Sequence, residues 1–437
     1  MIVIDILAII VSMILFIASL FRLKNEFNCR LFYYWFFWII FVLPLILDYV
    51  IGYPTYSYYG SRMRGFLISY GDNRTRIYYA AFIVFIQLVI LFHRPRIRIK
   101  LGNEERVNKS SKIQNYILSN RMTVICIAFA IIAPVICILL GWPQVIYEFG
   151  WREAKKYQEF VSRGFFTYIE EISYIGTVAA VILLMFDREK KGANKFLFKI
   201  FSAILLFFNL CIESKRSIFL FLLIIMSYIF LLKNKKKNLM KIIVTMLGLI
   251  TIGLAASMYV KIVSRGYVGF DALYTTTRID FFRDDTVKMA LYSTFNKNQM
   301  KILSYPFESY VMQIGYLFFL GLISSAGFID IKRMGYDYYL TSALTGTNLL
   351  NEKWMTTSMY DEAIANFGIA GIIVIAIFMS YYLRFIDEQS EFESILWLAF
   401  LVLYTMFSLD YIIIFGEAVI VVHILLKQPI VFKYKTQ

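Results

Sequence analysis

The chain has few of the residues that most catalytic and redox centres need. It has two histidines, His93 and His423, among 437 residues, which nearly excludes a His-rich metal centre or a Ser–His–Asp triad. The P-loop, GxGxxG and HExxH motifs are missing. Four cysteines lie in or beside apolar runs without CxxC spacing, which predicts no disulfide: Cys29, Cys126, Cys137 and Cys211. We therefore expect neither a metal ion nor a cofactor.

Charged residues are also scarce. They make up 17% of the chain, while 59% is hydrophobic and the mean hydropathy is +0.65. A soluble protein has roughly 25% charged residues. Apolar runs of about 20 residues recur, and each can cross a bilayer as a helix. The short alternating strands of a membrane barrel are absent. The sequence predicts an all-α polytopic integral membrane protein.

The net charge of +15 admits two interpretations. A basic protein can bind nucleic acid, but basic residues of a membrane protein also collect in cytoplasmic loops and contact anionic lipid headgroups. Because the chain is so apolar, we adopt the second interpretation and expect no nucleic-acid partner.

The hydropathy predicts about eleven transmembrane helices. Basic segments at 93–121, 187–195 and 233–241 fall on one side if the spans alternate, and the positive-inside rule makes that side the cytoplasm. The N-terminus is then extracytoplasmic and the C-terminus cytoplasmic. The predicted spans are 2–21, 31–51, 77–92, 122–141, 166–186, 197–212, 217–232, 242–260, 363–383, 393–409 and 411–427.

This topology divides the chain into three parts. Residues 1–260 form an N-terminal bundle of about eight spans, 261–362 a large extracytoplasmic loop, and 363–437 the C-terminal helices and a cytoplasmic tail. The loop has ten basic and ten acidic residues, the balance of a folded exterior segment. Its apolar stretch 310–329 is long enough to span. We favour a re-entrant or interfacial segment, because a full crossing would turn the basic C-terminal tail outward.

A set of basic residues is predicted on the extracytoplasmic side. Several arginines that converge suit a pyrophosphate-bearing lipid, because a guanidinium grips phosphate oxygens in a bidentate manner. Snorkelling of single residues to headgroups is the alternative. The set is Lys215, Arg216, Lys261, Arg265, Arg278 and Arg283.

Carboxylates near the ends of spans form a second set. A carboxylate of raised pKa can act as a general base, although an ion pair with a neighbouring helix is the simpler interpretation. A proton relay of a transporter is also possible. The candidate bases are Glu170, Asp280 and Asp410. Glu362 lies at the start of a glycine-bearing helix, where a negative charge is favourable to the helix dipole.

Aromatic residues, 32 Tyr and 41 Phe, form a third signal. A membrane-interface belt accounts for most of them, and sugar rings also stack on aromatic faces. Tyr267 lies within the arginine-bearing segment and is a candidate sugar contact.

Three segments together resemble the Wzy-type oligosaccharide repeat-unit polymerases of O-antigen, enterobacterial common antigen and capsule assembly. The first is an exterior turn that opens an apolar run, "ESKRSIFLFLLII". The second is "YVKIVSRGYVGFDALYTTTRIDFFRDD". The third follows the large loop, "YDEAIANFGIAG". The resemblance covers roughly residues 205–375 in its pattern of charged and apolar residues.

The resemblance implies a GT-C-like membrane glycosyltransferase of the bacterial plasma membrane. Such an enzyme transfers a glycan from undecaprenyl pyrophosphate to a sugar hydroxyl of the next lipid-linked repeat unit, often beside a chain-length regulator protein. It implies Arg216, Arg265 and Arg278 as catalytic arginines, and Glu170, Asp280 or Asp410 as base. Lys215, Lys261, Arg283, Glu362 and Tyr267 are the predicted substrate-binding residues.

Two other functions remain open at this point. An O-antigen ligase-like transferase would use a similar site, but such ligases typically have a histidine in the large loop, which this chain lacks. A lipid-linked oligosaccharide flippase would have similar hydropathy, yet no internal repeat is visible here.

Overall fold

The computed structural model describes residues 2–23, 28–56, 62–93, 135, 269–315, 335–346, 355–389 and 391–407. The chain divides into two compact units, one of residues 1–99 with 225–412 and the other of 100–224 with 413–437. Every helix named below belongs to the first unit. Within the described ranges the secondary structure is helical, with no strand.

The helices are α1 (Ile2–Leu23), α2 (Cys29–Phe37), η1 (Trp38–Val42), α3 (Leu43–Val50), α4 (Arg64–Gly71), α5 (Asn73–Phe92), α13 (Phe270–Phe281), α14 (Asp284–Phe295), α15 (Glu308–Gly315), α17 (Tyr336–Thr345), α18 (Met359–Phe367), α19 (Ala370–Asp387) and α20 (Glu391–Met406). Segment η1 is a π-helical turn that joins α2 and α3 into one continuous rod.

Four of these helical rods are long and apolar enough to cross a membrane: Val3–Phe21, Cys29–Val50, Asn73–Phe92 and Ala370–Asp387. A helical membrane protein is therefore confirmed. The count of eleven spans and the GT-C-like fold stay predictions, because six predicted spans lie outside the described residues, apart from Val135: 122–141, 166–186, 197–212, 217–232, 242–260 and 411–427.

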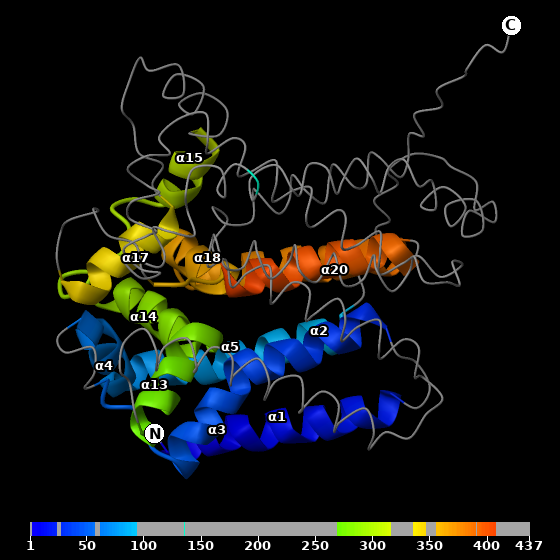
Figure 1. The fold of residues 1–437 in the computed structure, drawn as a ribbon, viewed down its shortest axis with the longest axis horizontal. Coiled ribbons are helices and arrows are strands. Elements are labelled where there is room, and N and C mark those ends of the chain that lie inside the picture. Colours follow the sequence, from blue (N-terminus) through cyan, green and yellow to red (C-terminus); the bar gives the residue numbers. More distant parts are fainter. Residues whose placement is uncertain are drawn as a thin grey trace, which may run out of the picture. The chain divides into compact units, whose positions relative to one another are not determined.

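The long helices run between two ends of the unit (Figure 1). At one end the starts of α1 and α5 meet the end of α3, where Arg76 pairs with Asp5 and the Tyr49 hydroxyl donates to Asp5 over 2.7 Å. At the other end Arg30 donates to the carbonyl of His93 over 2.9 Å and lies 3.5 Å from Asp387. We call the first end, at which Asp5, Tyr49 and Arg76 meet, the cluster end.

The predicted span 363–383 is replaced by two helices. Asp361 and Ser358 form a capping box that starts α18, and this helix stops at Gly368, whose φ of 63° lies in the left-handed region. The membrane-length helix α19 then begins at Ala370. The prediction of one helix is wrong here because a glycine that ends a helix looks, in sequence, like one that lies inside it.

The core of the unit is aromatic and centres on Tyr360 of α18. Its ring packs 5.1 Å from Phe41 and 5.5 Å from Phe37, measured between ring centroids. Its hydroxyl lies 2.9 Å from that of Tyr33, which also contacts Thr405 of α20 over 2.7 Å. Burial of these rings and pairing of their hydroxyls fix α18 between α2 and α20.

The described part of the predicted large loop packs against the N-terminal helices. Helix α14 contacts α4, α5 and α18, and all of them gather at the cluster end (Figure 1). Residues 316–334 include most of the predicted re-entrant segment. The helices on either side of this range both contact α18: Gln313 of α15 donates to Glu362, and Tyr336 of α17 donates to the carbonyl of Asp361. The path between these two helices lies outside the described residues, so the re-entrant segment stays a prediction.

Candidate functional site

A buried group of five charged residues lies where α3, α13 and α14 meet. We call Asp48, Arg278, Asp284, Asp285 and Lys288 the charge cluster. Asp48 lies near the end of α3, Arg278 in the last turn of α13, and the other three in the first turns of α14. The two acidic residues that begin α14 also lie favourably in the field of the helix dipole.

Arg278 is the centre of the charge cluster. Its Nη2 lies 3.2 Å from Asp48 Oδ2, and its Nη1 also pairs with Asp48, so this contact is bidentate. The Nε donates to Asp285 over 2.8 Å, and Nη2 pairs with Asp284. Each nitrogen of the guanidinium therefore faces a carboxylate, and a pyrophosphate could bind here only by replacing one of them.

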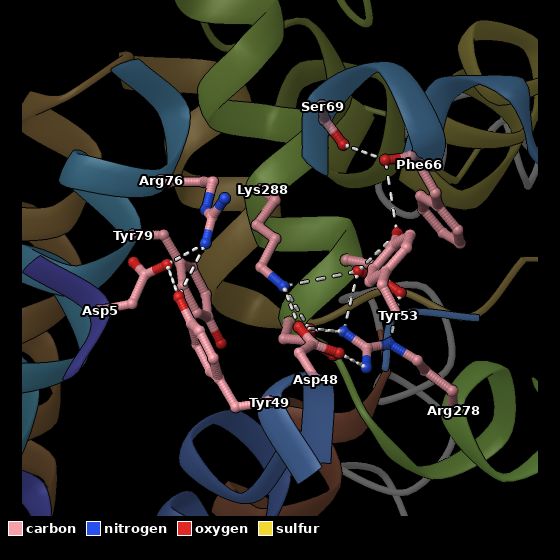
Figure 2. A network of polar contacts seen from close by, with 12 residues as sticks. Asp5, Asp48, Tyr49, Tyr53, Phe66, Ser69, Arg76, Tyr79, Arg278 and Lys288 are labelled. Atoms are coloured by element: carbon pink, nitrogen blue, oxygen red, sulfur yellow. Dashed lines mark hydrogen bonds and ion pairs between the residues drawn. The ribbon is translucent and has the colours of Figure 1, made fainter. Parts of the chain in front are cut away.

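Lys288 and a set of tyrosines complete the surroundings (Figure 2). The Lys288 Nζ lies 2.7 Å from Asp284 and 5.0 Å from the ring centroid of Tyr79. Both Tyr53 and Tyr56 donate to Asp285, the former over 3.1 Å. These bonds tie the loop after α3 to the start of α14.

The charge cluster has three carboxylates and two cations, so one negative charge is unbalanced. Burial raises the pKa of Asp284 to about 6 against the attraction of Arg278. Burial would also raise the pKa of Asp285, but Arg278 and Lys288 outweigh it and hold that pKa at about 2. Asp284 Oδ1 has no hydrogen-bond partner in the described part of the chain. Asp284 is therefore the carboxylate that most readily takes up a proton.

Arg283 has a different environment from Arg278. Its guanidinium is buried and donates to four backbone carbonyls, those of Met406, Ile279, Phe282 and Asp280, over 2.7–3.2 Å. Burial lowers its pKa to about 10, which leaves it charged at neutral pH. The side chain joins the α13–α14 connection to the end of α20, a position that serves the fold.

A second buried polar group joins α15 to α18. We call Ser309, Gln313, Glu362 and Asn366 the Glu362 cluster. Ser309 and Gln313 donate to Glu362 Oε1 over 3.2 and 2.8 Å, and Asn366 donates to Ser309 over 2.8 Å. One oxygen each of Gln313 and Asn366 finds no partner among the described residues. The cluster lies close to Asp361, whose pKa burial raises to about 7.

Four of the predicted site residues are described, and they fall into separate environments. Arg278 belongs to the charge cluster, Arg283 to the backbone contacts next to it, Asp280 is half-buried in α13, and Glu362 belongs to its own cluster. Asp280 is a neighbour of Arg283, which feels its charge and donates to its backbone carbonyl over 3.1 Å. The remaining predicted site residues lie outside the described residues: Lys215, Arg216, Lys261, Arg265, Tyr267, Glu170 and Asp410.

Sequence reasoning missed several members of the charge cluster. Asp48 had a usable signal, because an acidic residue inside a predicted span is costly without a partner. Tyr53 and Tyr56 have no signal beyond the high aromatic content of the chain, and Asp284, Asp285 and Lys288 lie only at or just after the end of the arginine-bearing segment. Nothing local in the sequence pairs these residues with Arg278.

The described residues contain no group of three or more His, Cys, Asp or Glu side chains suited to hold a metal ion. The charge cluster is instead a buried network of ion pairs in which burial raises the pKa of Asp284 to about 6. Compared with known proteins, the chain matches no family model, no curated sequence and no solved structure.

Proposed function

We propose that the chain is a membrane glycosyltransferase that polymerises oligosaccharide repeat units linked to undecaprenyl pyrophosphate, at the outer face of the bacterial plasma membrane. The product is O-antigen or a related surface polysaccharide. In each transfer the bond from the donor sugar C1 to pyrophosphate breaks and a bond from C1 to an acceptor hydroxyl oxygen forms. The hydroxyl proton leaves, and undecaprenyl pyrophosphate is released.

One observation supports this proposal most. Two of the three segments that carry the resemblance to Wzy-type polymerases pack against each other, although about 75 residues separate them in the chain. Helix α14 begins at the end of the arginine-bearing segment and contacts α18, which holds "YDEAIANF". Thr356, just before α18, donates to the carbonyl of Ile279 in α13 over 3.3 Å. These contacts support a site that the two segments share.

We assign residue roles according to which side chains are already paired with other groups of the protein. Pyrophosphate leaves with negative charge, and fixed cations stabilise that charge in a site of low dielectric constant. Arg278 is held by three carboxylates, so we assign it to positioning the arginine-bearing segment. Direct contact with pyrophosphate is assigned to Arg216 and Arg265, with Lys215 and Lys261 beside them. Glu170, Asp280 and Asp410 remain the candidate bases.

A lipid-linked oligosaccharide transporter is the second candidate. It is favoured by two buried carboxylates, Asp284 and Asp361, whose pKa values of about 6 and about 7 allow proton uptake near neutral pH. Proton-coupled transporters use such groups.

Deletion of the gene in its host separates these functions. The surface glycolipids would be resolved by size on a gel. For the polymerase we expect loss of the polymer ladder while a single-repeat band persists, because synthesis, flipping and anchoring still operate. Loss of the single-repeat band as well, with lipid-linked units trapped inside, would establish the transporter. A ladder of lipid-linked polymer that is never anchored would establish the ligase-like transferase.

Point variants then test the proposed roles in the complemented deletion strain. Arg265→Ala should abolish chain extension at a normal protein level. Arg216→Lys should also reduce it, because an ammonium cannot reproduce the bidentate contact. Arg64→Ala is the matched control, since Arg64 is exposed. Wild-type chain lengths in the Arg265→Ala and Arg216→Lys strains would overturn the assignment of these two residues.

A further inference from the structure

Helix α15 and the residue before it have reversed polarity. The polar side chains Glu308, Ser309 and Gln313 are buried, whereas the apolar ones face outward: Phe307 is 51% exposed, Val311 57% and Ile314 46%. These three positions are spaced i, i+4, i+7 and therefore form one stripe along the helix. A helix on a water-exposed surface normally presents the opposite arrangement.

The polar side chains of α15 form hydrogen bonds within the protein. Glu308 accepts from the backbone N–H groups of Ser304 and Tyr305, which caps the start of the helix. Ser309 and Gln313 donate to Glu362 in the Glu362 cluster. These bonds fix the rotation of α15 about its axis, so the exposed stripe cannot turn inward without breaking them.

The stripe joins the outer surface of a candidate membrane helix. The Phe307 ring packs edge-on against Phe367, 4.7 Å between centroids, at the end of α18. The exposed residues Ile369, Ile373 and Ile377 follow along α19, which is long and apolar enough to span. The apolar surface of α19 therefore continues onto α15.

The segment before α15 has features of a membrane interface. Phe307 has a φ of 66°, a left-handed conformation that is unfavourable for a bulky residue. Lys301 and Tyr305 are exposed just before the helix, and these residue types are typical of the interface between headgroups and acyl chains.

From these contacts we infer that the stripe of Phe307, Val311 and Ile314 lies against the acyl chains of the bilayer. Removal of three large apolar side chains from water is favourable, and Glu308, Ser309 and Gln313 each form hydrogen bonds on the opposite side of the helix. The occupant is lipid because the stripe extends the outer surface of α19. It follows that the Glu362 cluster lies below the level of the lipid headgroups. The inference stands whether or not the proposed function holds.

Collision measurements on spin labels in liposomes test this inference on the full-length chain. Single nitroxides would be placed by Val311→Cys and Ile314→Cys, with Asn298→Cys as the control at an exposed polar position, after replacement of the four native cysteines. At 311 and 314 we expect oxygen, which concentrates in hydrocarbon, to collide more often than a polar nickel chelate. At 298 the order should be reversed.

Two results would overturn the inference. More nickel than oxygen collisions at 311 and 314 would mean that the stripe faces water. Low collision rates with both agents would mean that protein covers it, either another segment of this chain or a second copy. If the cysteine-free chain does not fold, a photo-crosslinking amino acid at 311 in the otherwise native chain gives the same decision. A phospholipid adduct by mass spectrometry is expected, whereas a protein adduct, or labelling by water alone, contradicts it.

Discussion

Arg278 and Asp48 lie 230 positions apart in the chain and form a bidentate, fully buried ion pair. The pair joins the last helix of the arginine-bearing segment to the end of a membrane-length helix. Because Asp284 and Asp285 also bind Arg278, this one guanidinium holds three carboxylates together.

Substitution of Arg278 should therefore lower the stability of the folded protein. Arg278→Ala leaves three buried carboxylates around Lys288 alone, and removal of one partner from a buried pair costs about 3–5 kcal/mol. We expect a marked drop in folded yield and thermal midpoint, measured by fluorescence-detected size exclusion in detergent. Arg278→Lys should recover only part of the lost yield and thermal midpoint, because lysine lacks the planar guanidinium group.

Arg64→Ala is the control for this measurement, since an exposed change is usually within about 0.5 kcal/mol. An Arg278→Ala protein with the thermal midpoint of the wild type would show that the guanidinium is not needed for the fold and restore direct substrate contact as its role.

Two adjacent carboxylates of the charge cluster should respond differently to the same substitution. Asp284→Asn removes the unbalanced charge and keeps an oxygen for Arg278 and Lys288, so the thermal midpoint at pH 7.5 should be unchanged or higher. Asp285→Asn weakens the bonds from Arg278, Tyr53 and Tyr56, and hydrogen bonds to charged groups contribute about 1.5–3 kcal/mol. We expect a clear loss of stability. Equal losses in both variants would contradict the difference in pKa between these carboxylates.

The raised pKa of Asp361 predicts how stability depends on pH. Its folded pKa of about 7 lies above the usual value of about 4 for an unfolded chain, so the folded state binds the proton more tightly. This contribution is complete below about pH 4 and is lost as the pH rises to about 7. The thermal midpoint of the wild type should fall between pH 6 and 7.5, and part of this fall comes from Asp284, whose pKa is about 6.

Asp361→Asn supplies the matched comparison for this dependence on pH. An amide oxygen can still accept from the Ser358 N–H, which Asp361 Oδ1 does over 2.6 Å, while the titration is removed. The thermal midpoint should change less between pH 6 and 7.5 in this variant than in the wild type. Parallel slopes in the two proteins would assign the titration to another group.

Gly371 should be far less tolerant of a side chain than Gly71. A Cβ at 371 would meet the Ala363 carbonyl oxygen and lie 2.6 Å from its carbonyl carbon, both backbone atoms of α18. Such overpacking typically costs about 1–3 kcal/mol, so Gly371→Ala should lower the thermal midpoint. At Gly71 nothing lies within 4 Å of an added Cβ, and Gly71→Ala should be neutral. Equal midpoints would mean that α18 and α19 separate easily.

The sequence was informative about the membrane helices because a long apolar run has few alternatives to a spanning helix. The described starts of α1, α2 and α5 lie within four residues of the predicted spans. The break at Gly368 was missed, because it depends on how α18 packs between other helices.

The candidate site was less accessible to sequence reasoning. Arg278 stood out as an arginine in a polar segment, but its partner Asp48 belongs to an apolar helix far away in the chain. Which charges a guanidinium meets is decided by tertiary packing, and no short-range pattern encodes it. For the same reason the sequence could not distinguish Arg278, held by carboxylates, from Arg283, held by backbone carbonyls.

The π-helical turn η1 determines the direction in which the side chains of α3 point, because α3 follows it in the same rod. Its wider turn leaves the carbonyl of Ile40 facing the Arg283 N–H, at 3.5 Å, and that of Phe41 accepting from Tyr79 over 2.7 Å. Such a turn accommodates one extra residue in an α-helix. Deletion of one residue within 38–42 would restore α-helical winding and rotate α3 by about 100°. Asp48 would then point away from Arg278. One inserted residue in the middle of a membrane-length helix therefore determines whether the ion pairs of the charge cluster can form.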